Sequence, residues 1–182
     1  MTLQNNDNLT NNRLQNNNAK MVAYIGVFSA FAIIISYLES LIPINIAIPG
    51  IKPGFANIVI VLAIYSLNYK AGIIINFIRI IVIGIMFGNI YSILISFAGA
   101  IFSLTFMYIA KKIKLFSIIG VSVCGGVAHN IGQLIAAYFI TNVFVLNYYL
   151  PFLIVGGVIT GILVGILSNI IYERIIFKIG GI

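Results

Sequence analysis

The sequence predicts an all-α integral membrane protein, a bundle of six transmembrane helices with both termini in the cytoplasm. Composition is the first reason, because 62% of the 182 residues are hydrophobic and only 7% are charged. A soluble domain averages about 25% charged residues, so a surface of this composition needs a lipid bilayer as its solvent. The second reason is a series of long apolar segments, and the third is the distribution of the basic residues.

Six apolar runs follow one another after residue 20, and a helix needs about 20 apolar residues to span a membrane. The runs cover roughly residues 21–41, 54–69, 71–88, 90–110, 115–141 and 149–172. They are continuously apolar and lack the alternation of barrel strands, which favours helices. All prolines lie at or between the ends of the runs, where a missing N–H does least damage: Pro43, Pro49, Pro53 and Pro151.

The basic residues predict the orientation of these helices. With the N-terminus inside, the inner side of the membrane receives eight basic residues and the outer side receives only Lys52. The inner residues are Arg13, Lys20, Lys70, Lys111, Lys112, Lys114, Arg174 and Lys178. Because basic residues favour cytoplasmic loops, we expect both termini to be cytoplasmic in the cell membrane. The net charge of +7 therefore reflects orientation and not binding to nucleic acid.

The chain divides into three predicted parts, the transmembrane domain 21–172 and two cytoplasmic tails, 1–20 and the short basic 173–182. Residues 1–20 are rich in asparagine and too polar to offset the entropy lost on ordering, so we expect disorder there. They also lack the apolar core of a cleavable signal peptide. The single cysteine, Cys124, excludes an internal disulfide and any CxxC motif.

Polar residues inside the apolar runs predict a binding pocket. In "GVAHNIGQ", His129 lies about 21 Å along its helix from Leu115, and Gln133 follows one helical turn later on the same face. In "NFIRI", Asn76 and Arg79 are neighbours on one face of the third run. An ionisable residue in a membrane costs several kcal/mol unless it is paired or hydrated.

Together these polar residues converge on the outer half of the bundle from four runs. The candidate substrate-binding residues are Glu39, Lys52, Asn57, Arg79, Asn89, His129, Asn130 and Gln133. An alternative is purely structural: Arg79 pairs with Glu39, and the amides hold helices together, which we prefer for Asn76. The outer loop 43–54 would serve either as a lid over the pocket or as a segment lying in the membrane interface.

Small residues recur at four-residue spacing and let helix backbones approach closely in lipid. The last run has Gly157, Gly161 and Gly165, and we expect these glycines to pack within the bundle. For Gly26 and Ala30 on the first run, a second interpretation is open. They would form a docking face for another membrane protein.

Several blocks of the sequence resemble a known membrane family. These are "SYLESLIP", "PGIKPGFANIV", "NFIRI" followed by "FGN", and "GVAHNIGQ". They resemble the Gx transporters, often labelled heptaprenyl diphosphate synthase component I, over about residues 21–170. That family looks like the substrate-binding S components of energy-coupling factor transporters, which have six helices and a ligand pocket in the outer half.

The resemblance implies partners for this chain. S components dock through a small-residue face on the first helix onto a transmembrane T component driven by two ATPase subunits. The candidate substrate-binding residues fall within the matching blocks, although the resemblance does not identify the ligand. The basic residues suggest a small molecule with an anionic or polar part, such as a flavin, a vitamin-like acid or an isoprenoid precursor.

The synthase label can be tested against the residues themselves. Prenyl synthases hold magnesium with aspartate-rich motifs to neutralise diphosphate charge, and this chain has one aspartate, Asp7. We therefore predict no catalytic residue, no metal site and no cofactor. Two other functions stay open: a membrane anchor, or an accessory subunit of a redox or prenyl-lipid and quinone pathway without catalysis of its own.

Overall fold

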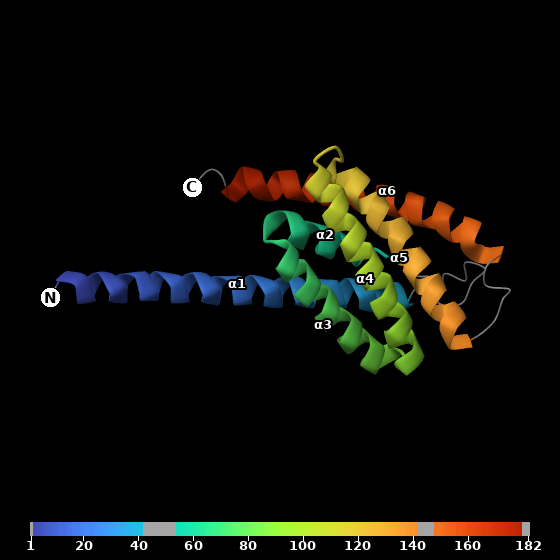
Figure 1. The fold of residues 1–182 in the computed structure, drawn as a ribbon, viewed down its shortest axis with the longest axis horizontal. Helices are drawn as coiled ribbons and strands as arrows, with labels where there is room; N and C mark the ends of the chain where they lie inside the picture. The colour runs from blue at the N-terminus through green and yellow to red at the C-terminus, as the bar shows by residue number, and fades with distance from the viewer. Residues whose placement is uncertain (1, 42–53, 142–147, 180–182) are drawn as a thin grey trace.

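The computed structural model describes residues 2–41, 54–141 and 148–179, with side chains described between residues 17 and 174 of these ranges. Every regular element longer than one turn within them is an α-helix, as the sequence predicts (Figure 1). The helices are α1 (Thr2–Leu41), α2 (Asn57–Ser66), α3 (Tyr69–Phe87), α4 (Ile90–Ile113), α5 (Ile118–Thr141) and α6 (Leu150–Ile179). The chain is therefore a helical, multi-pass membrane protein.

Five of these helices are long and apolar enough to span a membrane, but α2 is not. Its ten residues rise only about 15 Å, so the prediction of six transmembrane helices is wrong for this segment. The local chemistry explains the shortening. Gly54 takes a positive φ of 77°, which marks a turn, and Asn68 already caps α3 by accepting a hydrogen bond from the Ala71 N–H. Only the residues between these two signals are free to form α2.

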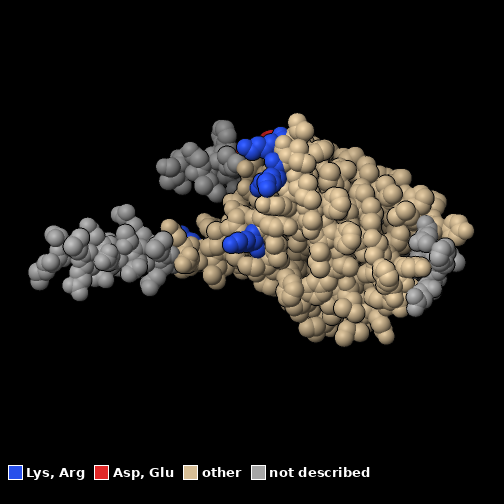
Figure 2. Space-filling model, viewed as in Figure 1, with Lys and Arg blue, Asp and Glu red and all other residues tan. Residues whose placement is uncertain are grey.

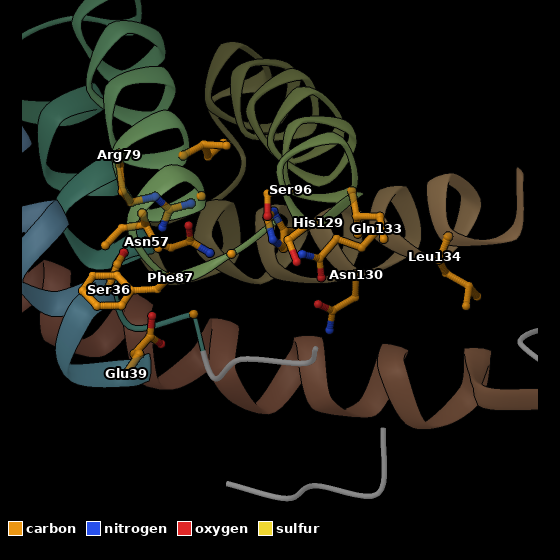
Figure 3. Close-up of a pocket in the computed structure, with 18 of the residues that line it drawn as sticks. Ser36, Glu39, Asn57, Arg79, Phe87, Ser96, His129, Asn130, Gln133 and Leu134 are labelled. Carbon is orange, nitrogen blue, oxygen red and sulfur yellow. The ribbon is translucent and has the colours of Figure 1, made fainter. Parts of the chain in front are cut away.

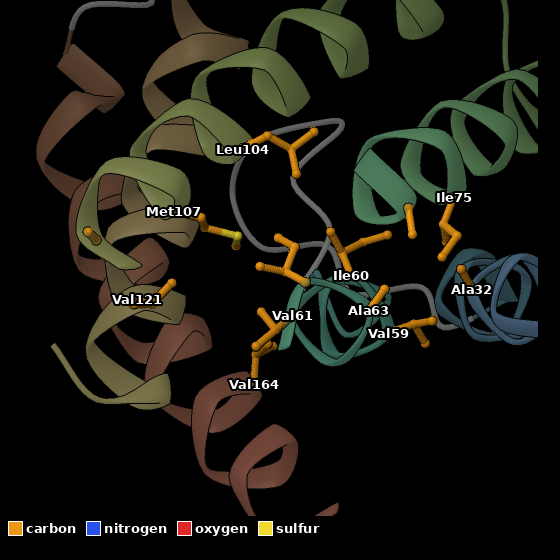
Figure 4. Packing of buried hydrophobic residues seen from close by; sticks show 13 residues of the cluster. Ala32, Val59, Ile60, Val61, Ala63, Ile75, Leu104, Met107, Val121 and Val164 are labelled. Carbon is orange, nitrogen blue, oxygen red and sulfur yellow. The ribbon is translucent and has the colours of Figure 1, made fainter. Parts of the chain in front are cut away.

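Helix α2 lies in the apolar core of the bundle (Figure 4). Its residues from Val59 to Ile64 are all buried, which is the expected fate of a helix that is apolar on every side. It packs against α1, α3 and α6. The surrounding cluster includes Ala32, Ile75, Leu104, Met107, Val121 and Val164.

The other half of the bundle is held by close helix packing, most extensive between α5 and its two neighbours, α4 and α6. A Cβ added at Gly161 would lie 2.6 Å from the Val123 Cα, and one at Gly165 would lie 2.7 Å from the Ile119 Cα. These glycines therefore let α6 approach the backbone of α5. The packing role predicted for the glycines of the last run is confirmed.

The start of α1 and the end of α6 lie at the same end of the bundle (Figure 1). Lysine and arginine side chains gather at this end on the visible face (Figure 2), which we call the basic end. This arrangement has the asymmetry that the positive-inside prediction requires. The assignment of the basic end to the cytoplasm stays a prediction.

The N-terminal segment differs from the sequence prediction. We expect residues 1–20 to be disordered, whereas the structure continues α1 from Thr2 through this segment. A helix is costly to nucleate but cheap to extend. The membrane-spanning part of α1 supplies the nucleus, so the polar residues before it can continue the same helix.

Candidate functional site

A cavity of about 400 Å³ lies among all six helices (Figure 3). On α3, α4 and α6 its lining residues fall within the half of the helix that is farther from the basic end. Helix α1 contributes residues close to its C-terminal end, and α5 contributes residues from its midpoint onward. The cavity thus occupies the level at which the sequence predicts a pocket.

Six of the eight candidate residues line this cavity: Glu39, Asn57, Arg79, His129, Asn130 and Gln133. They come from four helices, α1, α2, α3 and α5. Lys52 lies outside the described residues. So does most of the 43–54 loop, of which only Gly54 is described, and Gly54 lines the cavity.

Asn89 is the exception among the candidates. It is exposed, and its side-chain Oδ1 accepts a hydrogen bond of 2.8 Å from the Ser92 N–H. This is the N-cap of α4, the position that asparagine favours because its side chain satisfies a free N–H. Asn89 is absent from the described lining of the cavity and has a capping role, and the expectation that it contacts a ligand stays a prediction.

Arg79 is the most unusual side chain of the site. It is only 9% exposed, yet among the described residues its guanidinium makes no hydrogen bond or ion pair with the protein. Figure 3 shows the side chain reaching into the cavity, close to Asn57 and directed to the side where His129 lies. A buried charge normally has a partner, and the five N–H donors of Arg79 have no acceptor among the described residues.

Glu39 does not form a direct ion pair with Arg79, although the two charges influence each other across the cavity. Its Oε1 accepts a hydrogen bond of 2.6 Å from the Phe55 N–H. Ala56, the residue at the N-cap position before α2, provides no side-chain hydrogen bond to the helix. Glu39 therefore supplies from α1 the negative group that stabilises the start of α2, and the structural pair with Arg79 is replaced by this contact.

The polar residues of α5 divide into two roles. The Asn130 Nδ2 donates a buried hydrogen bond of 2.8 Å to the Leu153 carbonyl, which ties α5 to α6. His129, in contrast, has a buried Nδ1 without a hydrogen-bond partner among the described residues. Gly99 of α4 makes room for it, because a Cβ there would lie 2.9 Å from His129 Cε1 and 2.6 Å from Gln133 Cγ.

The structure adds cavity residues that the sequence analysis did not assign to the site. Ser36 and Ser96 line the cavity. A signal for Ser36 was available, because it lies three residues before Glu39 and so shares its helix face. Asn76 is buried outside the cavity, and its Oδ1 has no hydrogen-bond partner among the described residues.

Metal binding finds no support in the part of the chain that the structure describes. There, His129 is the only histidine, and no three histidine, cysteine or carboxylate side chains lie close enough to hold an ion. The chemistry available in the cavity is therefore hydrogen bonding and charge pairing by a guanidinium, amides, hydroxyls and an imidazole.

One comparison with known proteins gives a result. The model of the family described as heptaprenyl diphosphate synthase component I matches residues 28–171, which is most of the chain and includes every described residue of the cavity. Searches of the curated proteins and of the solved structures gave no match.

Proposed function

The chain belongs to the heptaprenyl diphosphate synthase component I family, and we propose that it is the substrate-binding membrane subunit of an importer. In this proposal it resembles the S component of an energy-coupling factor transporter and has no catalytic activity of its own. The basic end faces the cytoplasm of the cell. The cavity then opens from the outer half of the membrane, where an imported molecule arrives.

One observation carries this proposal: the unpartnered guanidinium of Arg79 in a cavity of about 400 Å³. Small-molecule sites are concave, largely apolar and contain a few converging polar groups, with volumes of about 300–1,000 Å³. An ionisable side chain within a membrane marks a functional site by default. A membrane anchor needs neither feature, so the cavity favours a binding subunit.

The proposed partners are a transmembrane T component and two ATPase subunits. Gly26 and Ala30 both lie on the exposed side of α1, and a Cβ added at Gly26 would meet nothing within 4 Å. A larger residue there leaves the packing of the bundle intact. This face of α1 is therefore available to a partner helix.

The description of the family supports a second candidate, an accessory subunit that assists a soluble prenyl diphosphate synthase. In that case also the chain would not catalyse the reaction, because one aspartate cannot form the aspartate-rich motifs that hold magnesium. The two candidates differ in their partners. An importer subunit co-purifies with a T component and ATPases, and an accessory subunit co-purifies with a synthase.

The test of binding is native mass spectrometry of the protein purified in mild detergent. We expect a retained small molecule on the wild type and its loss from Arg79→Gln. The matched control is Arg174→Gln, because Arg174 is exposed and lies outside the cavity. Ligand retention by Arg79→Gln at the wild-type level would remove the main support for the proposal.

The test of docking is co-purification of the partners with a double variant, Gly26→Leu and Ala30→Leu. We expect this variant to lose the T component and to keep the small molecule. Gly156→Leu on α6 is the control, since a Cβ there also meets nothing within 4 Å. Loss of both partner and ligand from the double variant would show that the α1 face supports the fold.

A further inference from the structure

The two charged groups of the described cavity differ in what they already bind. The Glu39 carboxylate accepts a hydrogen bond from the backbone at the start of α2. Arg79 has no acceptor among the described residues, although it is more than nine-tenths buried. Arg79 is therefore the positive group whose hydrogen-bond donors the described part of the cavity leaves for a ligand, while Glu39 adds a negative charge to the same lining. Beside it, the buried His129 Nδ1 adds a hydrogen-bonding position.

On α3 and α5 the residues that line the cavity are also ordered by depth. On α3, Arg79, Ile83 and Phe87 line it at four-residue spacing, so they share one face. Helix α3 runs away from the basic end (Figure 1), which places Phe87 about 12 Å farther from that end than Arg79.

Helix α5 runs in the same direction and repeats this order. His129, Gln133 and Ala137 line the cavity at the same spacing, from an imidazole through an amide to a methyl group. The deep end of the cavity is thus polar and cationic. The end farther from the basic end is apolar on these two helices, whereas Glu39 near the end of α1 and Ser92 near the start of α4 also line the cavity.

The volume limits what can occupy this space. About 400 Å³ is in the lower part of the range for small-molecule sites. A cavity of this size encloses a compact molecule and not a heptaprenyl chain.

We infer that the cavity binds a compact monocarboxylic acid in one direction, with its carboxylate at Arg79 and its apolar body extending to Phe87 and Ala137. This inference rests on the proposed function and specifies the ligand class of the same site. A planar guanidinium donates two parallel hydrogen bonds to a carboxylate. A diphosphate carries more negative charge than one guanidinium neutralises, and excess buried charge is strongly unfavourable.

The ligand class can be tested with molecules that share a body and differ in the head group. Geranic acid, geraniol and geranyl diphosphate form one set, and 4-phenylbutanoate with 4-phenylbutanol forms a second. Affinities are measured by calorimetry on the full chain in lipid nanodiscs. We expect each acid to bind at least tenfold more tightly than its alcohol, and geranic acid more tightly than geranyl diphosphate.

Two variants assign this preference to a residue. Arg79→Gln should abolish the preference for acid over alcohol, and Arg174→Gln should keep it, because Arg174 is exposed and lies outside the cavity. Tighter binding of geranyl diphosphate than of geranic acid would overturn the inference. A preference for acid over alcohol that persists in Arg79→Gln would overturn it too. Equal binding of acid and alcohol, or no binding of any probe, would overturn it as well.

The direction of binding has its own test. Ala137→Phe fills the apolar end. It should lower the affinity for 4-phenylbutanoate at least tenfold and change the affinity for butanoate less than twofold. Gly99→Ala crowds His129 and Gln133 at the polar end and should lower the affinity for both acids. The ligand-free melting temperature of each variant verifies its fold. If Ala137→Phe lowered the affinity for butanoate more than that for 4-phenylbutanoate, the proposed direction of binding would be wrong.

The failure of this inference is distinguishable from the failure of the proposed function. If the molecule retained by the purified protein is neutral or carries several negative charges, the importer function stands and the ligand class is wrong. If no molecule is retained and neither a T component nor ATPases co-purify, the function itself is wrong.

Discussion

Two basic side chains lie beside the core of this membrane protein, and the protein treats them differently. Lys111 of α4 donates a hydrogen bond of 2.7 Å to the Ile64 carbonyl of α2 and lies 4.3 Å from the centre of the Tyr65 ring. Arg79 of α3 has no such partner among the described residues, although it is more deeply buried. A basic residue inside a bundle is thus structural where the protein supplies its acceptors. It indicates a binding site where the protein does not.

The same contrast applies to α2 as a whole. The positive end of its dipole meets the Glu39 carboxylate, and the negative end meets the Lys111 ammonium. Both charges have the sign that stabilises a helix end. The short core helix is therefore fastened at each end by a charge from a neighbouring helix, and Arg79 contributes to neither contact.

The largest effect expected from this comparison is on ligand affinity. Arg79→Gln should weaken binding of the retained ligand by about 2–5 kcal/mol, the loss typical when one partner of a buried charge pair is removed. The ligand-free melting temperature in detergent should remain close to that of the wild type, because Arg79 holds no protein group in place. A ligand-free collapse that is rescued by adding Glu39→Gln would show that the two residues stabilise each other after all.

Glu39 provides the next largest effect, on stability. Glu39→Ala leaves the Phe55 N–H, in the turn before α2, without its acceptor. It should lower the free energy of unfolding by about 1.5–3 kcal/mol, as for a hydrogen bond to a charged group. Glu39→Gln keeps an acceptor oxygen and should be less destabilised. Thermal unfolding of the two variants in detergent measures the difference. Equal stability of Glu39→Ala and wild type would contradict the capping role.

Lys111 should behave as the structural counterpart of Arg79. Lys111→Met keeps the apolar stem but leaves the Ile64 carbonyl without a donor, which should cost about 1–3 kcal/mol of stability. Ligand affinity should not change, because Lys111 does not line the cavity. Lys112→Met is the control, since Lys112 is exposed on the same helix. A loss of affinity at unchanged stability in Lys111→Met would reverse the assignment.

The smallest effect is expected at Asn89. Asn89→Ala removes the N-cap of α4 and should lower stability by about 0.5–2 kcal/mol, with unchanged ligand affinity. Asn89→Asp keeps a capping oxygen and should retain wild-type stability. Calorimetric titration of both variants separates the two roles, because a ligand contact would appear as weaker binding by both.

The class of the protein and the level of its cavity could be predicted from sequence because they follow from local patterns. Apolar runs identify a membrane bundle whatever their packing. Residues three or four apart share a helix face, which correctly placed His129 beside Gln133 in the cavity. The glycines at four-residue spacing on α6 likewise predicted its close approach to α5.

Only the tertiary structure decided which polar groups are already satisfied, and this distinguishes capping and packing residues from those free to bind a ligand. Glu39 bonds to a residue 16 positions away, Asn130 to one 23 positions away and Lys111 to one 47 positions away. No pattern within a single helix specifies such pairs, because hydrogen bonds form between groups that the packing of separate helices brings within about 3 Å. The same packing leaves Arg79 unpartnered, since no acceptor from any described helix reaches its guanidinium.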